Sequence, residues 1–135
     1  MPKVLIVDDY AAIRTAVRTR LERCSGLVVC GEAADGTDAI EKAIKLNPDV
    51  IILDLAMPGL NGVETASVLK SLQPHILIVV LTMYSEALGK SLASAVGIDA
   101  VLAKSDGLNK VVECVRTLLN PAAGVLKAQL GSQLG

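Results

Sequence analysis

Four short apolar runs in this chain each end on residues that can bind a metal ion or a phosphate group. The first run leads into Asp8 and Asp9, and the later runs end at Asp54, Thr82 and Lys104. Carboxylate oxygens are hard ligands, which suit Mg²⁺ or Mn²⁺. A threonine hydroxyl suits phosphate oxygens as a hydrogen-bond donor, and a lysine ammonium suits them as a point charge. Together the five side chains predict a site for a divalent cation and an anion.

The apolar runs are typical of parallel strands that are buried on both faces. Each run is short, rich in aliphatic residues and bounded by polar ones, which predicts strands covered by helices on either side. Ligands of open parallel sheets bind just outside the carboxyl ends of the strands. Because each run ends on one of the candidate residues, we expect all five side chains to converge on one edge of one sheet.

Amphipathic segments between the runs predict the helices that cover this sheet. Ile13, Val17 and Leu21 recur every fourth residue, and Arg14 and Arg18 then point outward, onto a face that we expect to be solvated. We expect a strand at 27–30, followed by a helix that includes Ile40, Ala43 and Ile44 and stops before Pro48. Asn61 and Glu64 open the next helix as a capping box. A weak helix is expected at 86–96, which contains Gly89, and the last helix has an apolar face that runs from Leu108 to Leu119.

Composition and charge are those of one small globular domain. The chain has 135 residues, 52% of them hydrophobic, and no Phe or Trp, so the core must consist of aliphatic side chains. A formal net charge of -1 gives no reason to expect nonspecific nucleic-acid binding. No apolar stretch approaches the ~20 residues needed to cross a bilayer. The three cysteines lack metal-ligand spacing, which favours reduced thiols in a cytoplasmic protein. We expect one domain at 1–120 and a short tail or linker stub at 121–135.

The most economical chemistry for these residues is phosphoryl transfer to a carboxylate. Without a cation, clustered carboxylates raise one another's pKa and destabilise the fold, so a bound divalent ion would stabilise it. A metal ion alone leaves Lys104 and Thr82 unexplained. An aspartate that attacks a phosphoryl group forms an aspartyl phosphate, and a metal ion and a lysine can neutralise the charge that develops during the transfer.

From Lys3 to about Leu119 the chain resembles the receiver domain of bacterial two-component response regulators, in wording closest to the LuxR-like branch of helix-turn-helix transcription factors. The resemblance implies an α/β, flavodoxin-like fold, with a doubly wound parallel sheet of five strands in the order 2-1-3-4-5 and helices on both faces. It rests on four motifs in the family's order, namely V-D-D at 7–9, D-x-x-M-P-x-x-N-G at 54–62, L-T at 81–82, and Lys104 after the last predicted strand.

The resemblance also implies a role for each matching residue. Asp54 would be the phosphoacceptor, Thr82 the switch hydroxyl and Lys104 the phosphate-binding lysine. For Mg²⁺, or Mn²⁺ in its place, the implied protein ligands are Asp9 directly, Asp8 mainly through water, Asp54, and the main-chain carbonyl of Ala56.

The same family implies the partners of the domain. The phosphoryl donor would be a histidine kinase or a phosphotransfer protein, and phosphorylation would switch a protein-interaction surface, with transcription as the regulated process in the LuxR-like branch. A homodimer through the last two helices and the fifth strand is one arrangement that the family allows. We expect no enzymatic turnover beyond self-phosphorylation and slow autodephosphorylation, and neither membrane association nor direct nucleic-acid binding by this chain.

The chain departs from the family pattern at several positions. Val101 stands where many receivers have an aromatic residue that moves with the switch hydroxyl, and Ser105 replaces the proline that often follows the lysine. Ala56 and Tyr84 flank the path of the hydrolytic water in the family. Neither side chain can position that water as a carboxylate or amide does, which favours a long-lived aspartyl phosphate. No helix-turn-helix sequence follows in the printed chain, which leaves open a stand-alone receiver or the first part of a transcription factor.

Three other functions compete with a phosphoacceptor receiver. A phosphatase of the haloacid-dehalogenase type needs a second aspartate two residues after the first, where this chain has Ala56. A nucleotide or flavin binder is disfavoured because neither G-x-x-x-x-G-K-[ST] nor G-x-G-x-x-G occurs. A pseudo-receiver that acts as a phosphorylation-independent scaffold stays open because of Val101.

Overall fold

The computed structural model describes residues 1–55, 62–83 and 96–120. Within these ranges, five strands pair in parallel in the order β2-β1-β3-β4-β5, which confirms the predicted flavodoxin-like sheet. The strands are β1 (Lys3–Val7), β2 (Val28–Ala33), β3 (Val50–Leu53), β4 (Leu77–Thr82) and β5 (Ala100–Ala103).

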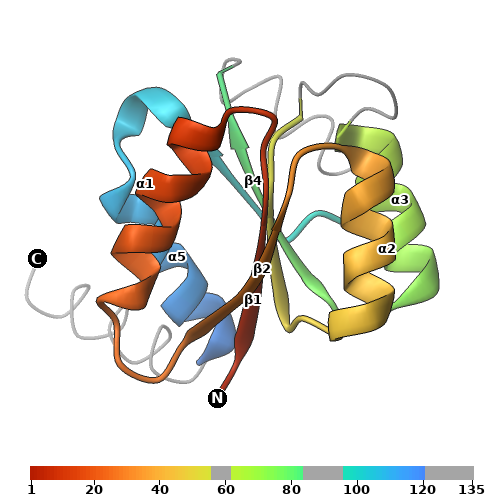
Figure 1. Ribbon diagram of the computed structural model, residues 1–135, viewed down its shortest axis with the longest axis horizontal. Helices are drawn as coiled ribbons and strands as arrows, with labels where there is room; N and C mark the ends of the chain where they lie inside the picture. Colours follow the sequence, from red (N-terminus) through yellow and green to blue (C-terminus); the bar gives the residue numbers. More distant parts are fainter. Residues whose placement is uncertain (56–61, 84–95, 121–135) are drawn as a thin grey trace, which may run out of the picture.

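The helices cover both faces of this sheet. Figure 1 shows α1 and α5 on one face, and α2 and α3 on the other. Most of the helix expected at 86–96, and the whole tail at 121–135, lie outside the described residues. The helices are α1 (Ala11–Glu22), α2 (Gly36–Leu46), α3 (Gly62–Leu72) and α5 (Asn109–Leu119), with a short 3-10 helix η1 (Lys104–Asp106) after β5.

Two aliphatic cores form because successive strand residues face opposite sides of the sheet. Leu5 and Ile51 pack with α2 and α3 residues such as Ala43 on one side. Val4 and Ile52 pack with α1 and α5 on the other side. Burial on both faces explains why the central strands are continuous apolar runs instead of alternating patterns.

Two predictions are corrected, one about the end of the second strand and one about the buried face of α2. The second strand does not stop at residue 30, because Gly31, Glu32 and Ala33 continue the pairing with β1. An edge strand tolerates a charged residue such as Glu32, so hydrophobicity alone placed its end too early. Ile44 was expected on the apolar face of α2, but it is 58% exposed, and the small residues Ala39 and Ala43 make the core contacts.

The predicted end of α2 before Pro48 is confirmed. Leu46 is the last helical residue, and Asn47 takes the left-handed conformation with φ of 51°. Asparagine tolerates this conformation better than most residues, and its N–H donates back to the Ala43 carbonyl. In the ranges that the structure describes, no helix is long and apolar enough to cross a bilayer.

Candidate functional site

The pairing of β1 with β3 brings two of the predicted carboxylates to the same strand edge. Val7 pairs with Leu53 in register, so Asp8 and Asp54 each follow directly after a paired residue. The Asp54 N–H donates to the Val7 carbonyl at 3.0 Å, and the Asp8 N–H donates to the Ala33 carbonyl at 3.1 Å. These main-chain bonds continue the sheet by one residue, which holds both carboxylates against its carboxyl edge.

The pairing of β4 with β5 brings the other two predicted groups to this edge. Thr82, the last residue of β4, is buried and pairs with Ala103, directly before Lys104. Lys104 Nζ lies 3.0 Å from Asp8 Oδ2 and 3.5 Å from Asp54 Oδ2. The side chain of Lys104 is 8% exposed, and those of both aspartates are 4% exposed. The lysine thus closes a buried cluster across three strands.

The charge of Lys104 is maintained by its two partners. Burial acts to lower the pKa of the ammonium, since a low-dielectric surrounding disfavours the charged form. The hydrogen bond to Asp8 and the Coulombic attraction of Asp54 outweigh that effect, so the pKa of Lys104 is raised. A charged lysine in this position can stabilise an anion that develops next to Asp54.

The three predicted acidic residues do form a cluster. Asp8, Asp9 and Asp54 each offer a carboxylate oxygen, and these oxygens all lie within 4.8 Å of one another. Asp9 Oδ1 is buried and has no hydrogen-bond partner among the residues at 1–55, 62–83 and 96–120. A buried carboxylate oxygen without a partner costs free energy, which a cation would relieve. Three hard oxygen donors this close together fit Mg²⁺ or Mn²⁺.

The backbone after Asp54 requires a glycine at position 62, which the sequence analysis named only as the last residue of the motif at 54–62. The Gly62 N–H, at the start of α3, donates to the Leu55 carbonyl at 3.0 Å. A Cβ at position 62 would lie 2.4 Å from both the Asp54 carbonyl oxygen and Leu55 Cα. Gly62 therefore permits a backbone approach that fixes the segment after the acidic residue. Ala56, whose carbonyl was expected to ligate the metal, and Asn61, expected as the cap of α3, lie outside the described residues.

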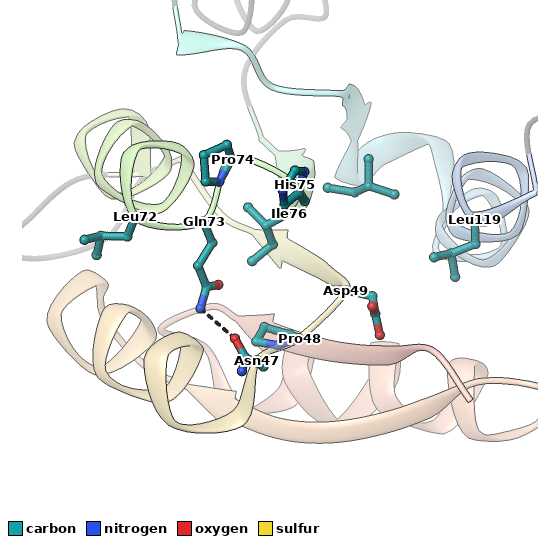
Figure 2. A pocket seen from close by; sticks show the side chains of 10 residues that line it. Asn47, Pro48, Asp49, Leu72, Gln73, Pro74, His75, Ile76 and Leu119 are labelled. Atoms are coloured by element: carbon teal, nitrogen blue, oxygen red, sulfur yellow. Dashed lines mark hydrogen bonds between the residues drawn. The ribbon is translucent and has the colours of Figure 1, made fainter.

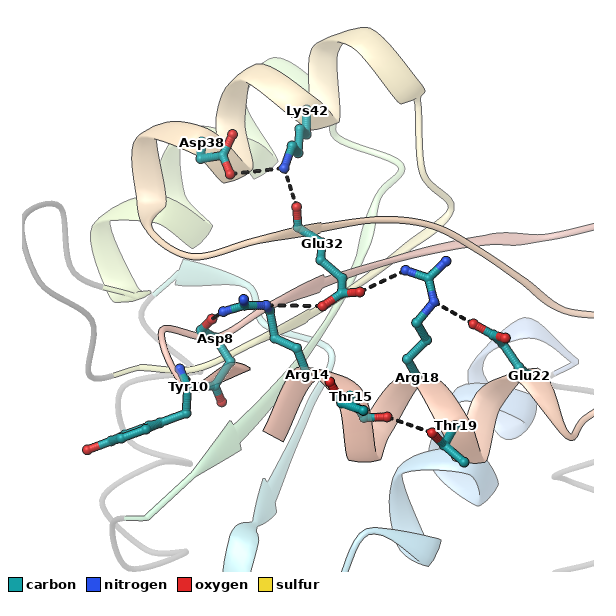
Figure 3. Close-up of polar contacts among 10 residues, drawn as sticks. All are labelled: Asp8, Tyr10, Arg14, Thr15, Arg18, Thr19, Glu22, Glu32, Asp38 and Lys42. Atoms are coloured by element: carbon teal, nitrogen blue, oxygen red, sulfur yellow. Dashed lines mark hydrogen bonds and ion pairs between the residues drawn. The ribbon is translucent and has the colours of Figure 1, made fainter. Parts of the chain in front are cut away.

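The expectation of a solvated basic face on α1 is wrong for Arg14, whose side chain is 18% exposed, whereas that of Arg18 is 40% exposed. Figure 3 shows both reaching Glu32 on β2. Arg14 Nε lies 3.1 Å from Glu32 Oε1, and Arg18 Nη1 lies 2.7 Å from Glu32 Oε2. The error follows from the early end assigned to β2, because Glu32 was then left out of the sheet and could not be recognised as their partner.

Two departures from the family pattern can be placed. Val101, in β5, pairs with Val80 and is a partly buried residue that packs against the core on the α2 and α3 side. Ser105 lies in η1 directly after Lys104 and is exposed. Tyr84, which was expected to flank the path of the hydrolytic water, lies outside the described residues.

A hollow of about 530 Å³ lies at the amino-terminal edge of the sheet. Figure 2 shows Asn47, Gln73, His75 and Leu119 among its lining residues. Asp49, the one carboxylate among the described residues that line it, already accepts a hydrogen bond from the Lys3 N–H at 2.7 Å. The cluster of three aspartates and Lys104 therefore favours the carboxyl edge of the sheet as the functional site.

Comparison with known proteins agrees with this assignment. The family model of the response regulator receiver domain matches residues 4–116. The chain is 37% identical over 118 residues to response regulator protein VraR of Staphylococcus saprophyticus, and 36% identical over 116 residues to response regulator GacA of Pseudomonas aeruginosa. The alignments cover 87% and 86% of this chain but 56% and 54% of those proteins. The chain thus spans about half the length of these relatives.

Solved receiver structures share the fold. The response regulator domain of Thermotoga maritima CheB has a TM-score of 0.81 at 29% identity, covering 89% of this chain and 97% of that one. A LuxR-family response regulator from Aurantimonas sp. SI85-9A1 has a TM-score of 0.82 at 26% identity, covering 87% of this chain and 84% of that one. The predicted likeness to the LuxR-like branch is confirmed. As the motifs at its strand ends predicted, this chain belongs to the family of response regulator receiver domains.

Proposed function

We propose that this receiver domain accepts a phosphoryl group on Asp54 and thereby switches a protein-interaction surface. The observation that carries the proposal is the buried contact of Lys104 Nζ with Asp8 at 3.0 Å and with Asp54 at 3.5 Å. In this arrangement the Asp54 carboxylate lies at the end of a strand, beside the fixed positive charge of Lys104. The intact cluster of acids and lysine favours the phosphoacceptor over a pseudo-receiver that acts as a scaffold alone.

In the proposed transfer, an Asp54 carboxylate oxygen attacks the phosphorus of a phosphohistidine on a histidine kinase or a phosphotransfer protein. The new P–O bond forms as the P–N bond breaks, and the histidine imidazole leaves with the electron pair of that bond. Lys104 donates to a phosphoryl oxygen and balances the added negative charge. The Thr82 hydroxyl donates to another phosphoryl oxygen, which draws the end of β4 toward Asp54.

The metal ligands in this proposal are Asp8, Asp9, Asp54 and the Ala56 carbonyl. Asp9 Oδ1, which has no hydrogen-bond partner within the described ranges, and the close spacing of the carboxylates support the first three. When bound, Mg²⁺ or Mn²⁺ would neutralise charge on the phosphoryl oxygens. Because Ala56 and Tyr84 offer no side chain that positions water as a carboxylate or amide does, hydrolysis of the aspartyl phosphate is proposed to take many minutes or longer. The domain would then react stoichiometrically, with no turnover of a separate substrate.

The proposed output is a shift between two packings of the elements that follow β4. β5 and α5 are two of these elements, and together they form the proposed output face. A hollow of about 300 Å³ lies between them, lined by residues that include Leu102 and Leu118. We further propose that the chain forms a homodimer through this face and signals in the cytoplasm. As in regulators of the LuxR-like branch, the proposed outcome is control of transcription. Residues 1–120 would form the receiver and 121–135 a tail or linker stub.

Intact mass after incubation with Mg²⁺ and phosphoramidate tests the proposal. We expect a gain of about 80 Da, one phosphoryl group, in the wild-type chain and none in Asp54→Asn. Asp38→Asn, which changes a carboxylate on α2 that pairs with Lys42, is the matched control and should be labelled as the wild type is. An unlabelled wild type that still binds Mg²⁺ would point to the scaffold instead.

A further inference from the structure

We infer that Arg14 is a positioning residue for the acidic site and that Glu32 holds it in place. Arg14 Nη1 donates to the main-chain carbonyl of Asp8 at 2.7 Å, and Arg14 Nε donates to Glu32 Oε1 at 3.1 Å. Figure 3 shows this arginine linking β2 to the loop between β1 and α1. The inference rests on the proposed function, since it concerns the metal ligands of that same site.

The Asp8 carbonyl is an effective point of control because it belongs to the peptide unit that joins Asp8 to Asp9. A peptide unit is planar and rigid, so a bond that sets the direction of this carbonyl also sets the Asp9 N–H and Cα. A hydrogen bond from a charged guanidinium is about twice as strong as a neutral one. The Arg14 side chain is 18% exposed, so water competes little for it. Arg14 therefore helps to decide where Asp9 presents its carboxylate.

The other contacts of this loop leave that role to Arg14. Asp8 Oδ1 accepts from the Tyr10 N–H at 2.9 Å, and Asp8 Oδ2 faces Lys104 at 3.0 Å. Both contacts hold the Asp8 side chain, and neither acts on its carbonyl. Asp9 Oδ1 has no partner in the described part of the chain that would orient it, so its placement depends on the backbone.

Glu32 makes a guanidinium tolerable so close to a cation site. An uncompensated positive charge there would repel Mg²⁺, whereas Glu32 neutralises it through Oε1. Glu32 is itself fixed, because its Oε2 accepts from Arg18 at 2.7 Å and its main-chain carbonyl accepts from Lys42. The arginine is thus held in place before a metal ion arrives. Partners of this kind, one step removed from the ligands, typically change metal affinity by 10–100-fold when removed.

Mn²⁺ affinity of the full 135-residue chain, read from the electron paramagnetic resonance of the free ion, separates positioning from stability. Arg14→Met should weaken Mn²⁺ binding about tenfold. Arg20→Met is the matched control, since it removes the same charge from the same helix while Arg20 donates to Asn109 and not to Glu32, and it should stay within about twofold of the wild type. Loss of a positive charge alone would strengthen cation binding, so weaker binding in Arg14→Met identifies the lost hydrogen bond.

Two further variants keep the test decisive if Arg14→Met does not fold. Arg14→Lys retains the charge but cannot bond to Asp8 and Glu32 in the same fork, so its Mn²⁺ affinity should fall between those of the wild type and Arg14→Met. Glu32→Gln should weaken binding as well, because it releases the guanidinium and leaves it uncompensated. Equal affinities for Arg14→Met and Arg20→Met, or a wild-type chain that binds no Mn²⁺, would overturn the inference.

Phosphoramidate labelling distinguishes failure of this inference from failure of the proposed function. Arg14→Met should still reach full labelling of Asp54 when Mg²⁺ is raised about tenfold, since the acceptor and Lys104 are untouched. An unlabelled wild type with an intact Mn²⁺ difference would reject phosphoryl acceptance and retain the role of Arg14. Normal labelling at low Mg²⁺ in Arg14→Met, with unchanged Mn²⁺ affinity, would reject the role of Arg14 and retain the acceptor.

Discussion

Lys104 Nζ lies 3.0 Å from Asp8 Oδ2, and both side chains are almost fully buried. This contact joins the two ends of the domain, because Asp8 follows the first strand and Lys104 follows the last. Asp8 thereby serves two purposes in the proposed site, as a partner of the lysine and as part of the metal cluster. Removing either side chain should alter both folding stability and the response to divalent cations.

The first prediction concerns Lys104→Met. The substitution leaves Asp8 and Asp54 buried without the ammonium, and breaking a buried ion pair from one side costs about 3 kcal/mol or more. We expect that loss in urea unfolding without divalent cations, and a partial recovery in saturating Mg²⁺. Lys110→Met, at an exposed position of α5, should change the free energy of unfolding by less than about 0.5 kcal/mol.

The second prediction concerns Asp9→Asn. Without a cation, this change removes one of three clustered carboxylates and should raise the free energy of unfolding by about 1 kcal/mol, the repulsion of two unit charges about 4 Å apart in water. It also removes a metal ligand, so Mg²⁺ should no longer raise the melting temperature. Thermal unfolding with Mg²⁺ and with a chelator measures both effects. A variant that is less stable than the wild type in chelator would show that Asp9 makes a favourable contact instead.

The third prediction concerns Gly62→Ala. The added Cβ would lie 2.4 Å from the Asp54 carbonyl oxygen and from Leu55 Cα, so the backbone that carries the acceptor must shift. We expect a loss of about 2 kcal/mol or more in urea unfolding, together with slower labelling by phosphoramidate. Gly26→Ala is a useful contrast, because nothing lies within 4 Å of its added Cβ and φ is +88°. Strain alone should cost it about 1 kcal/mol, without an effect on labelling.

The fourth prediction is a pH dependence that Glu32 contributes to stability. The hydrogen bond from Arg18, opposed by burial and aided by Arg14, lowers the pKa of the Glu32 carboxyl. A lowered pKa in the folded state means that the contribution is complete above the unfolded pKa and is lost as pH falls through the folded value. Glu32→Gln should therefore cost about 1 kcal/mol above about pH 5, and the difference from wild type should shrink as the pH falls further.

Urea unfolding of the wild type and Glu32→Gln from neutral to acidic pH checks this expectation. Glu41→Gln, at an exposed position of α2, should show no comparable pH-dependent difference. If the cost of Glu32→Gln stayed constant down to the most acid pH, the ion pairs with α1 would not be its source.

The sequence by itself determined the central strands and the residues at their ends. Strands buried on both faces must be continuous aliphatic runs, so the chain marks them plainly, and Asp8, Asp54, Thr82 and Lys104 each stand at the end of one. Strand order followed only through the family resemblance, since nothing in the runs themselves states which strand neighbours which.

The tertiary structure decided the contacts that cross elements. Glu32 was missed as the partner of Arg14 because an edge strand need not be apolar, and so hydrophobicity ended β2 too soon. Ile44 was placed in the core because periodicity cannot tell which of two apolar residues a neighbouring helix covers. Gly62 was recognised only as part of a motif, and the reason for a glycine there emerges when α3 is seen against the Asp54 backbone. Such contacts depend on distances between segments far apart along the chain, and local pattern does not encode those distances.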